Sequence, residues 1–234
     1  MKVRKAVLLA AGKGTRMKEL TNELPKPMLV VRGKPILLHI IEGLRAAGVL
    51  EFCIVVGFKA EIVREYFGDG SKFGVRITYV TQVVQDGTGR VVELAKEFAG
   101  NDPFVLSYGD ILIAPENYVR LTNLEYDALV TTKLNESEVA KGGSVVLNDR
   151  FELIDLVEKP TGPAPSPWYN AGVYTFRPSI FTFTAKLKLS PRGEYELTDA
   201  VRDLAQSGAV VKGLELTGEW ADVRDPDVLA ALNA

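Results

Sequence analysis

The sequence predicts an α/β protein whose central sheet is mixed but mostly parallel and is flanked by helices. In the first half, short apolar runs that favour strands alternate with segments of helical periodicity. This alternation is typical of a parallel sheet with helices on both faces. After Asp110 the strand-like segments follow one another with no long helix between the middle ones. We therefore expect a sheet of about seven strands that carries a small β-rich extension.

The individual elements follow from apolar periodicity and from the residues that begin and end helices. Pro35 begins one helical pattern and Gly48 ends it. Residues 160–167 are rich in proline and predict a loop. Strands are expected at residues 4–10, 51–57, 75–80, 103–109, 127–134, 142–148, 151–159 and 168–176. Helices are expected at residues 35–48, 60–70, 88–100, 196–208 and 225–234.

Composition limits the partners that the chain can have. Of 234 residues, 47% are hydrophobic and 25% are charged, as in ordinary globular proteins. The net charge of −2 gives no basic field for nucleic acid or an anionic membrane, so we expect neither partner. The apolar run from Ala6 to Ala11 is shorter than the core of a signal peptide, and we interpret it as a buried strand of a cytoplasmic protein. A single cysteine, Cys53, excludes an internal disulfide.

A glycine-rich loop follows the first expected strand in "VLLAAGKGTRMKELTNELPKPM". Gly12 and Gly14 leave backbone N–H groups free to approach a phosphate. Arg16 and Lys26 add positive charge, and prolines on both sides of Lys26 fix its backbone. The loop therefore predicts a triphosphate site. An ordinary surface loop with two solvated cations remains the alternative.

Two familiar phosphate motifs do not fit this loop. A dinucleotide fingerprint needs a third glycine where Met17 stands and a helix that begins promptly, and we expect no such helix. A Walker loop needs Ser or Thr after its lysine, but Gly14 follows Lys13. A nicotinamide-dependent oxidoreductase is therefore disfavoured.

Motifs along nearly the whole chain resemble those of the sugar-1-phosphate nucleotidylyltransferases. The glycine loop and "LPKPM" resemble the family's signature, and "TQVVQDGTGR", "SYGD", "LVEKP", "YNAGVYTF", "PRGEYELTDAV" and "EWADV" follow in the family's order from Lys2 to about Ala231. The resemblance implies a Rossmann-like nucleotidyltransferase fold and one domain over residues 1–234. Residues 1–110 would form its nucleotide-binding half and residues 111–234 its sugar-phosphate-binding half.

The resemblance also implies roles for particular residues. Arg16 and Lys26 would be catalytic, and Asp110 and Asp222 would hold Mg²⁺. The residues expected to bind the nucleotide are Ala10, Ala11, Gly12, Gly14, Thr15, Gln82, Gly87 and Thr88. The residues expected to bind the sugar phosphate are Gly143, Glu158, Lys159 and Asn170.

Two positions depart from the family's pattern. The segment "GGSVV" leaves open whether Gly143 or Ser144 replaces the glycine that contacts the sugar. Arg224 stands where the family commonly has glycine, so the turn after Asp222 is in question.

The implied reaction joins a nucleoside triphosphate to a sugar 1-phosphate and releases pyrophosphate. A phosphate monoester is largely a dianion at neutral pH, since its second pKa is about 6, so the nucleophile needs no general base. A chain with a single histidine and no Cys/His cluster suits such chemistry. Gln82 and Gly87 favour UTP or dTTP, and glucose 1-phosphate is the default acceptor.

Other members of the same fold leave alternatives open. A relative could use GTP or CTP with a mannose, N-acetylated sugar or inositol phosphate, or could be a non-catalytic subunit that senses nucleotide sugars. A homo-oligomer is also open. The residues after Asp222 are too few for the hexapeptide β-helix that some relatives append, so we expect no acyltransferase activity from these residues.

Overall fold

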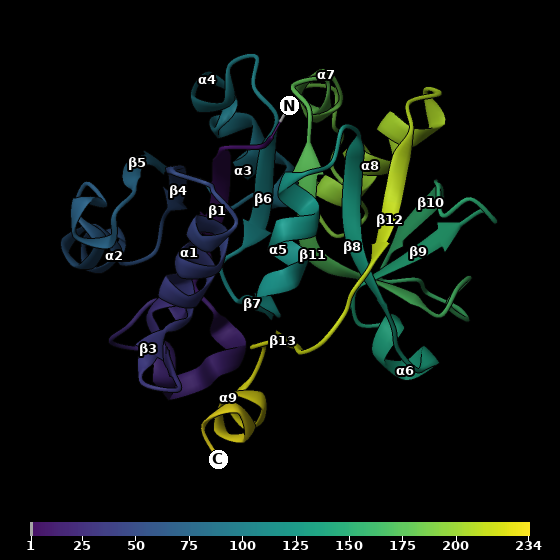
Figure 1. The fold of residues 1–234 in the computed structure, drawn as a ribbon. Helices are drawn as coiled ribbons and strands as arrows, with labels where there is room; N and C mark the ends of the chain where they lie inside the picture. Colours follow the sequence, from purple (N-terminus) through teal and green to yellow (C-terminus); the bar gives the residue numbers. More distant parts are fainter. Residues whose placement is uncertain (1) are drawn as a thin grey trace.

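The computed structural model describes residues 2–234 and contains a nine-stranded mixed sheet (Figure 1). Along its main path the strand order is β10-β9-β11-β6-β1-β4-β5, while β8 pairs with β11 and β12 pairs with β8. The main strands are β1 (Lys5–Ala10), β4 (Glu51–Val56), β5 (Arg76–Thr81), β6 (Phe104–Tyr108), β8 (Asp127–Lys133), β9 (Gly143–Leu147), β10 (Leu153–Glu158), β11 (Trp168–Phe176) and β12 (Val211–Glu215). The sequence predicted eight of these strands, and it missed β12.

The centre of the sheet is parallel because β1 lies between β4 and β6. Leu8 is opposite Ile54 on one side and Ser107 on the other. All four strands from β5 to β6 along this path run the same way, so their carboxyl ends meet at one edge. The predicted mixed, mostly parallel α/β fold is confirmed. Ligand-binding loops of such sheets lie at that edge.

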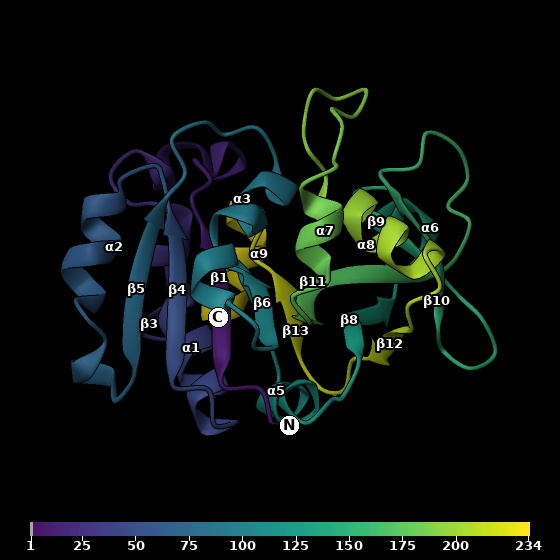
Figure 2. The same cartoon turned by 90° about the horizontal axis from the view of Figure 1, so that it is seen from above.

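Helices cover both faces, as Figure 2 shows from above. Helices α1 and α5 pack on one face, and α3, α7 and α8 pack together on the other. Alternate residues of β1 serve the two layers, because Leu8 lies in the core under α1 and Val7 in the core under α3 and α8. The helices are α1 (Ile36–Ala46), α2 (Ala60–Phe67), α3 (Thr88–Leu94), α4 (Lys96–Ala99), α5 (Pro115–Thr122), α6 (Glu136–Val139), α7 (Ile180–Thr184), α8 (Leu197–Gln206) and α9 (Pro226–Asn233).

Antiparallel strands build the second half of the sheet. Strand β11 pairs with β6 and continues outward to β8 and β9. Its register shifts between Asn170 and Tyr174, so the two ends of this long strand serve different neighbours. This region is the predicted β-rich extension.

Four short strands and three short 3₁₀ helices complete the fold of residues 2–234. Two of the strands form a small separate sheet, in which β13 (Trp220–Asp222) pairs antiparallel with β7 (Ile111–Ile113). The strands β2 (Val30–Val31) and β3 (Lys34–Pro35) form a hairpin. The short 3₁₀ helices are η1 (Thr15–Thr21), η2 (Lys26–Met28) and η3 (Ser71–Phe73).

Two expectations about helices were wrong. The helix predicted over residues 88–100 breaks at Ala95, whose φ and ψ of −89° and 2° separate α3 from α4. A helix does begin promptly after the glycine loop, since η1 starts at Thr15. It is a 3₁₀ helix that is interrupted at Lys18 (φ 53°, ψ −127°), not the α-helix of a dinucleotide site.

No helix within residues 2–234 is both long enough and apolar enough to span a membrane. Cys53 is buried in β4 and forms no disulfide.

Candidate active site

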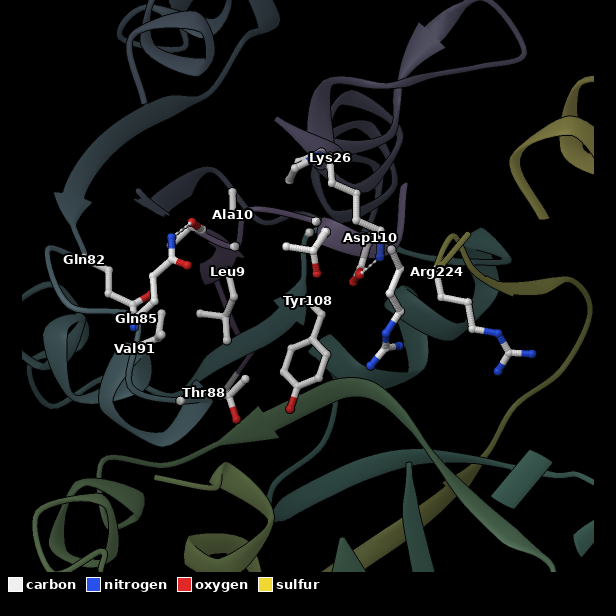
Figure 3. A pocket seen from close by; sticks show the side chains of 18 of the residues that line it. Leu9, Ala10, Lys26, Gln82, Gln85, Thr88, Val91, Tyr108, Asp110 and Arg224 are labelled. Carbon is white, nitrogen blue, oxygen red and sulfur yellow. Dashed lines mark hydrogen bonds and ion pairs between the residues drawn. The ribbon is translucent and has the colours of Figure 1, made fainter. Parts of the chain in front are cut away.

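A cavity of about 460 Å³ opens at the carboxyl ends of the parallel strands (Figure 3). The end of β1 contributes the glycine loop, and the end of β6 contributes Tyr108, Gly109 and Asp110. The cavity wall consists of Leu9, Ala10, Ala11, Gly12, Gly14, Thr15, Arg16, Lys26, Pro27, Gln82, Gln85, Gly87, Thr88, Val91, Tyr108, Gly109, Asp110, Glu194 and Arg224. All ten residues predicted to be catalytic or to bind the nucleotide therefore lie in one wall.

The glycine loop passes close to the lysine segment. Gly14 has φ 66°, and a Cβ atom there would stand 2.9 Å from the Cβ of Lys26. A larger residue would push the two segments apart. A Cβ atom at Gly12 would meet nothing within 4 Å, so the cavity is open at that point. Backbone N–H groups of the loop can be approached by an anion there.

Lys26 is held in place in the cavity wall. Pro25 and Pro27 frame the 3₁₀ turn that carries it, and the N–H of Met28 closes the turn on the carbonyl of Pro25 at 2.8 Å. The side chain is 14% exposed and its ammonium group pairs with the carboxylate of Asp110 (Figure 3). Lys26 therefore holds a fixed positive charge beside an acidic group.

Gln82 lies at the far end of the same cavity from Lys26 (Figure 3), and Gly87 is also part of the cavity wall. Gln82 is 7% exposed, and its backbone N–H continues the pairing with β4 by donating to Val56 (2.8 Å). Gly87 has φ 117°, and a Cβ atom there would lie 2.5 Å from the backbone of Tyr195. The close approach of Tyr195 explains why this turn needs glycine.

The sequence did not single out Gln85 or Tyr108, although both line the cavity. Gln85 donates from its amide to the carbonyl of Ala11 at 3.1 Å and so ties the end of the cavity near Gln82 to the glycine loop. The ring of Tyr108 lies 6.1 Å from that of Tyr174. Its position three residues after Gln82, in the same segment, was the feature of the sequence that could have suggested Gln85 as a cavity residue.

Asp110 and Asp222 come together through the small sheet. Asp222 lies opposite Ile111 in the β7–β13 ladder, and the N–H of Val223 donates to the carbonyl of Asp110 at 3.0 Å. Burial raises the pKa of Asp222 to about 6, and the nearby charge of Asp110 adds to this effect. The opposing influence of Lys26 is smaller. Two carboxylates that disfavour each other's charge are a natural place for a cation.

Three of the residues predicted to bind the sugar phosphate share one face of the outer strands. Gly143 is opposite Glu158 in the β9–β10 ladder, and a Cβ atom on Gly143 would lie 3.1 Å from the Cβ of Asn170. Ser144 points the other way and donates to the carbonyl of Ser166 (3.2 Å). The structure thus places Gly143, not Ser144, beside Glu158 and Asn170.

These residues form a second region next to the cavity. Within residues 2–234, the cavity wall does not include Gly143, Glu158, Lys159, Asn170 or Asp222. The amide of Asn170 donates to the hydroxyl of Tyr174 at 2.6 Å. The ring of Tyr174 in turn lies beside that of Tyr108, which is part of the cavity wall. The tyrosine pair therefore lies between the cavity and the outer strands. Lys159 follows β10 with φ 43° and donates from its backbone to Gly142 at 2.8 Å.

Arg192 pairs with Glu158 of this second region and with two further carboxylates. Its guanidinium contacts Glu158 at 3.5 Å, Glu194 at 3.2 Å and Glu196 at 2.8 Å. Burial raises the pKa of Glu158 above its usual range, and Arg192 opposes that shift. The motif "PRGEYELTDAV" contains Arg192, but the sequence did not predict that it would bridge three carboxylates.

Comparison with known proteins agrees with this geometry. The family model described as "Nucleotidyl transferase" matches residues 5–234. The chain is 34% identical over 226 residues to UTP--glucose-1-phosphate uridylyltransferase AglF of Haloferax volcanii, covering 95% of this chain and 92% of that protein. It is 39% identical over 227 residues to the bifunctional protein GlmU of Methanocaldococcus jannaschii, covering 97% of this chain but 53% of the relative.

One further curated relative and one solved structure extend the comparison. Glucose-1-phosphate thymidylyltransferase of Streptomyces griseus is 36% identical over 222 residues, covering 93% of this chain and 62% of the relative. A crystal structure of UDP-glucose pyrophosphorylase complexed with UDP-glucose aligns with a TM-score of 0.90 and 25% identity, covering 99% of this chain and 97% of that one. The chain thus spans about half the length of GlmU and nearly all of AglF. The family predicted from the motifs is confirmed: the chain belongs to the nucleotidyl transferases.

Proposed function

We propose that the protein transfers a nucleotidyl group from a nucleoside triphosphate to a sugar 1-phosphate and releases pyrophosphate. The observation that carries this proposal is the meeting of Lys26, Asp110 and Asp222 between the cavity and the sugar-facing residues of the outer strands. A reaction at phosphorus between two anionic substrates needs charge neutralisation and alignment more than it needs acid–base groups. The names of AglF, of the Streptomyces griseus thymidylyltransferase and of the UDP-glucose pyrophosphorylase specify glucose 1-phosphate or UDP-glucose, which supports the same chemistry here.

Different groups of residues along the site would bind different parts of the substrates. Ala10, Ala11, Gly12, Gly14 and Thr15 would cradle the triphosphate with backbone groups. Arg16 and Lys26 would offset the charge that develops around the attacked phosphorus, and that charge is where fixed cations contribute most. Thr88 begins α3 under the nucleoside and accepts a hydrogen bond from the N–H of Leu197 (3.2 Å). Residues 1–110 would thus form the nucleotide-binding half and residues 111–234 the sugar-phosphate-binding half.

A magnesium ion fits the pair of aspartates. Magnesium takes oxygen ligands and commonly uses one or two carboxylates with substrate phosphates. Burial of Asp222 and its repulsion by Asp110 disfavour its negative charge, so a bound cation would be stabilising here. The ammonium group of Lys26, which pairs with Asp110, already neutralises part of this negative charge. When bound, the ion would neutralise phosphate charge and orient the phosphates. Asp110 and Asp222 would hold it.

On the acceptor side, Gly143, Glu158 and Asn170 would contact the sugar and Lys159 its phosphate. Gly143 leaves room between the other two side chains, because a Cβ atom there would already crowd Asn170. Once the phosphate oxygen of the sugar attacks the α-phosphorus, the bond to the β-phosphate breaks and pyrophosphate leaves. The attacking oxygen is already deprotonated, so no side chain has to remove a proton.

For the nucleotide we propose UTP or dTTP, with glucose 1-phosphate as the first acceptor to test. The buried amide of Gln82 can offer one donor and one acceptor to a pyrimidine edge. The test is a matrix of UTP, dTTP, CTP, GTP and ATP against a panel of hexose 1-phosphates, read by pyrophosphate release. UTP or dTTP should give the highest kcat/KM. A clear preference for GTP or CTP would overturn the assignment of the base while leaving the reaction class intact.

A further inference from the structure

Arg224 joins two parts of the site that no sheet connects. It is the second residue after Asp222, and its N–H closes a tight turn on the carbonyl of Asp222 at 2.7 Å. Its guanidinium reaches α6, where Nη2 lies 2.5 Å from Oε2 of Glu138. Both side chains are largely shielded, with exposed fractions of 23% and 26%. We call this ion pair the Arg224–Glu138 clamp.

On one side of the ion pair, Arg224 follows β13 of the small sheet. Among the described residues, β13 pairs with β7 and not with the nine-stranded sheet. The position of Asp222 relative to the outer strands therefore depends on side-chain contacts. One of these is aromatic, with the rings of Trp220 and Tyr169 5.6 Å apart. The clamp is the charged contact of the same junction.

On the other side of the ion pair, Glu138 lies in α6, shortly before β9, the strand that carries Gly143. The N-terminus of α6 is capped by the side chain of Asn135 (3.0 Å to the N–H of Glu138). Lys141 holds the other oxygen of the same carboxylate at 2.5 Å. Two residues further on, β9 begins at Gly143, between Glu158 and Asn170. The carboxylate of Glu138 thus fixes the turn that places Gly143.

The guanidinium of Arg224 points away from the Lys26–Asp110 pair, although its side chain lines the edge of the cavity (Figure 3). Glu138 is not part of the cavity wall among residues 2–234. A role through Glu138 therefore differs from direct binding of a substrate phosphate, and substitution of Glu138 can tell the two apart.

We propose that the Arg224–Glu138 clamp is a positioning device for the acceptor. It holds the turn after Asp222 and the start of β9 at the separation that a sugar 1-phosphate must span, with its sugar at Gly143 and its phosphate near Asp222. This inference rests on the proposed function, since it assigns an acceptor to these two segments. The base end of the cavity is built by other segments, so the clamp acts on the acceptor and not on the nucleotide.

The test is a double-mutant cycle with Glu138→Gln and Arg224→Gln, in which KM is measured separately for sugar 1-phosphate and nucleoside triphosphate. Each single variant should raise the KM for the acceptor about tenfold, because each breaks the same contact. The KM for the triphosphate should change less than about twofold, and the double variant should be no worse than either single variant. Arg224→Lys, which keeps a positive charge, should restore part of the affinity for the acceptor.

Glu152→Gln is the matched control. Glu152 pairs with Lys212 of β12 at 2.9 Å, with exposed fractions of 25% and 26%, and neither belongs to the cavity wall among residues 2–234. Its loss should leave both KM values unchanged, with a shift in Tm similar to that of Glu138→Gln.

Three results would overturn the inference. If Arg224→Gln weakens the acceptor but Glu138→Gln does not, Arg224 binds the acceptor directly. If both KM values rise together, or if the effects of the two substitutions multiply, the contact is not a positioning device for the acceptor. Failure of the proposed function would appear differently, as a wild-type protein that releases no pyrophosphate from any pair of substrates.

Discussion

Val223 donates its backbone N–H to the carbonyl oxygen of Asp110 at 3.0 Å, and this bond extends the β7–β13 ladder by one residue on each strand. Asp222 lies directly beside it in the chain and opposite Ile111 in the ladder. Two carboxylates far apart in sequence thus meet through a pair of three-residue strands. A single pair of three-residue strands is too short to be stable alone, so the site forms only when the tertiary fold does.

Gln82→Ala should raise the KM for the preferred triphosphate and reduce the discrimination among bases. A site that pairs a buried amide with a base penalises a base that leaves the amide unpaired. The measurement is kcat/KM for UTP, dTTP, CTP and GTP in the wild type and the variant. An unchanged order and spread of the four values would show that Gln82 does not read the base.

Gly87→Ala should weaken triphosphate binding by on the order of 10-fold to 10²-fold, because the added Cβ would displace the backbone of Tyr195. Gly33→Ala is the control, since Gly33 also has a positive φ of 80° but a Cβ there would meet nothing within 4 Å. Both variants carry backbone strain of about 1–3 kcal/mol, so both should lower Tm. Equal KM values in the two variants would argue against a role for the Gly87–Tyr195 contact.

Cys53 gives a pH dependence of stability. Burial raises the pKa of its thiol from 9.0 to about 11. Above pH 9 the unfolded chain ionises this thiol while the folded protein keeps it protonated, so stability falls as pH rises towards 11. Relative to Cys53→Ala, the wild type should lose about 2 kcal/mol of unfolding free energy between pH 8 and pH 10.5. Chemical denaturation of both proteins at the two pH values measures their unfolding free energies. A difference between wild type and Cys53→Ala that is the same at both pH values would contradict the burial of the thiol.

The centre of the sheet could be predicted because its strands are buried on both faces. Residues 52–56 in β4 are all apolar and buried, and helix α1 before it follows Pro35 and ends two residues before Gly48. The position of the glycine loop in the cavity wall was predictable for a related reason, since its glycines and the lysine between two prolines lie within one short segment. Local sequence carries this information.

The elements that were missed depend on contacts between distant segments. Strand β12 is paired at one edge by β8, and only one of its five residues is buried, so its apolar pattern is weak. Helix α5 begins at Pro115, and its buried residues include polar Asn117, which donates to the carbonyls of Ala114 and Thr217. The role of Arg224 could not be predicted either, because its partner Glu138 lies in another part of the sequence.

Removal of divalent metal should stop turnover without unfolding the protein. The proposed ion sits on two side chains at the edge of the sheet, and the hydrophobic cores on both faces do not depend on it. Pyrophosphate release in excess chelator, with Tm recorded in the same buffer, measures both effects. Full activity in the chelator would show that Asp110 and Asp222 serve another purpose.

The most direct test of the account is the rate of pyrophosphate release by Asp110→Asn, Asp222→Asn and the double variant, with UTP or dTTP, glucose 1-phosphate and saturating Mg²⁺. Each single substitution should lower kcat by on the order of 10²-fold or more, since the carboxylates would act on charge that is redistributed in the transition state. The double variant should be much less than multiplicatively worse, because the two groups act as a unit. Circular dichroism should show that all three variants keep the fold. A single variant that retains near-normal turnover would contradict the claim that these two aspartates form one catalytic centre.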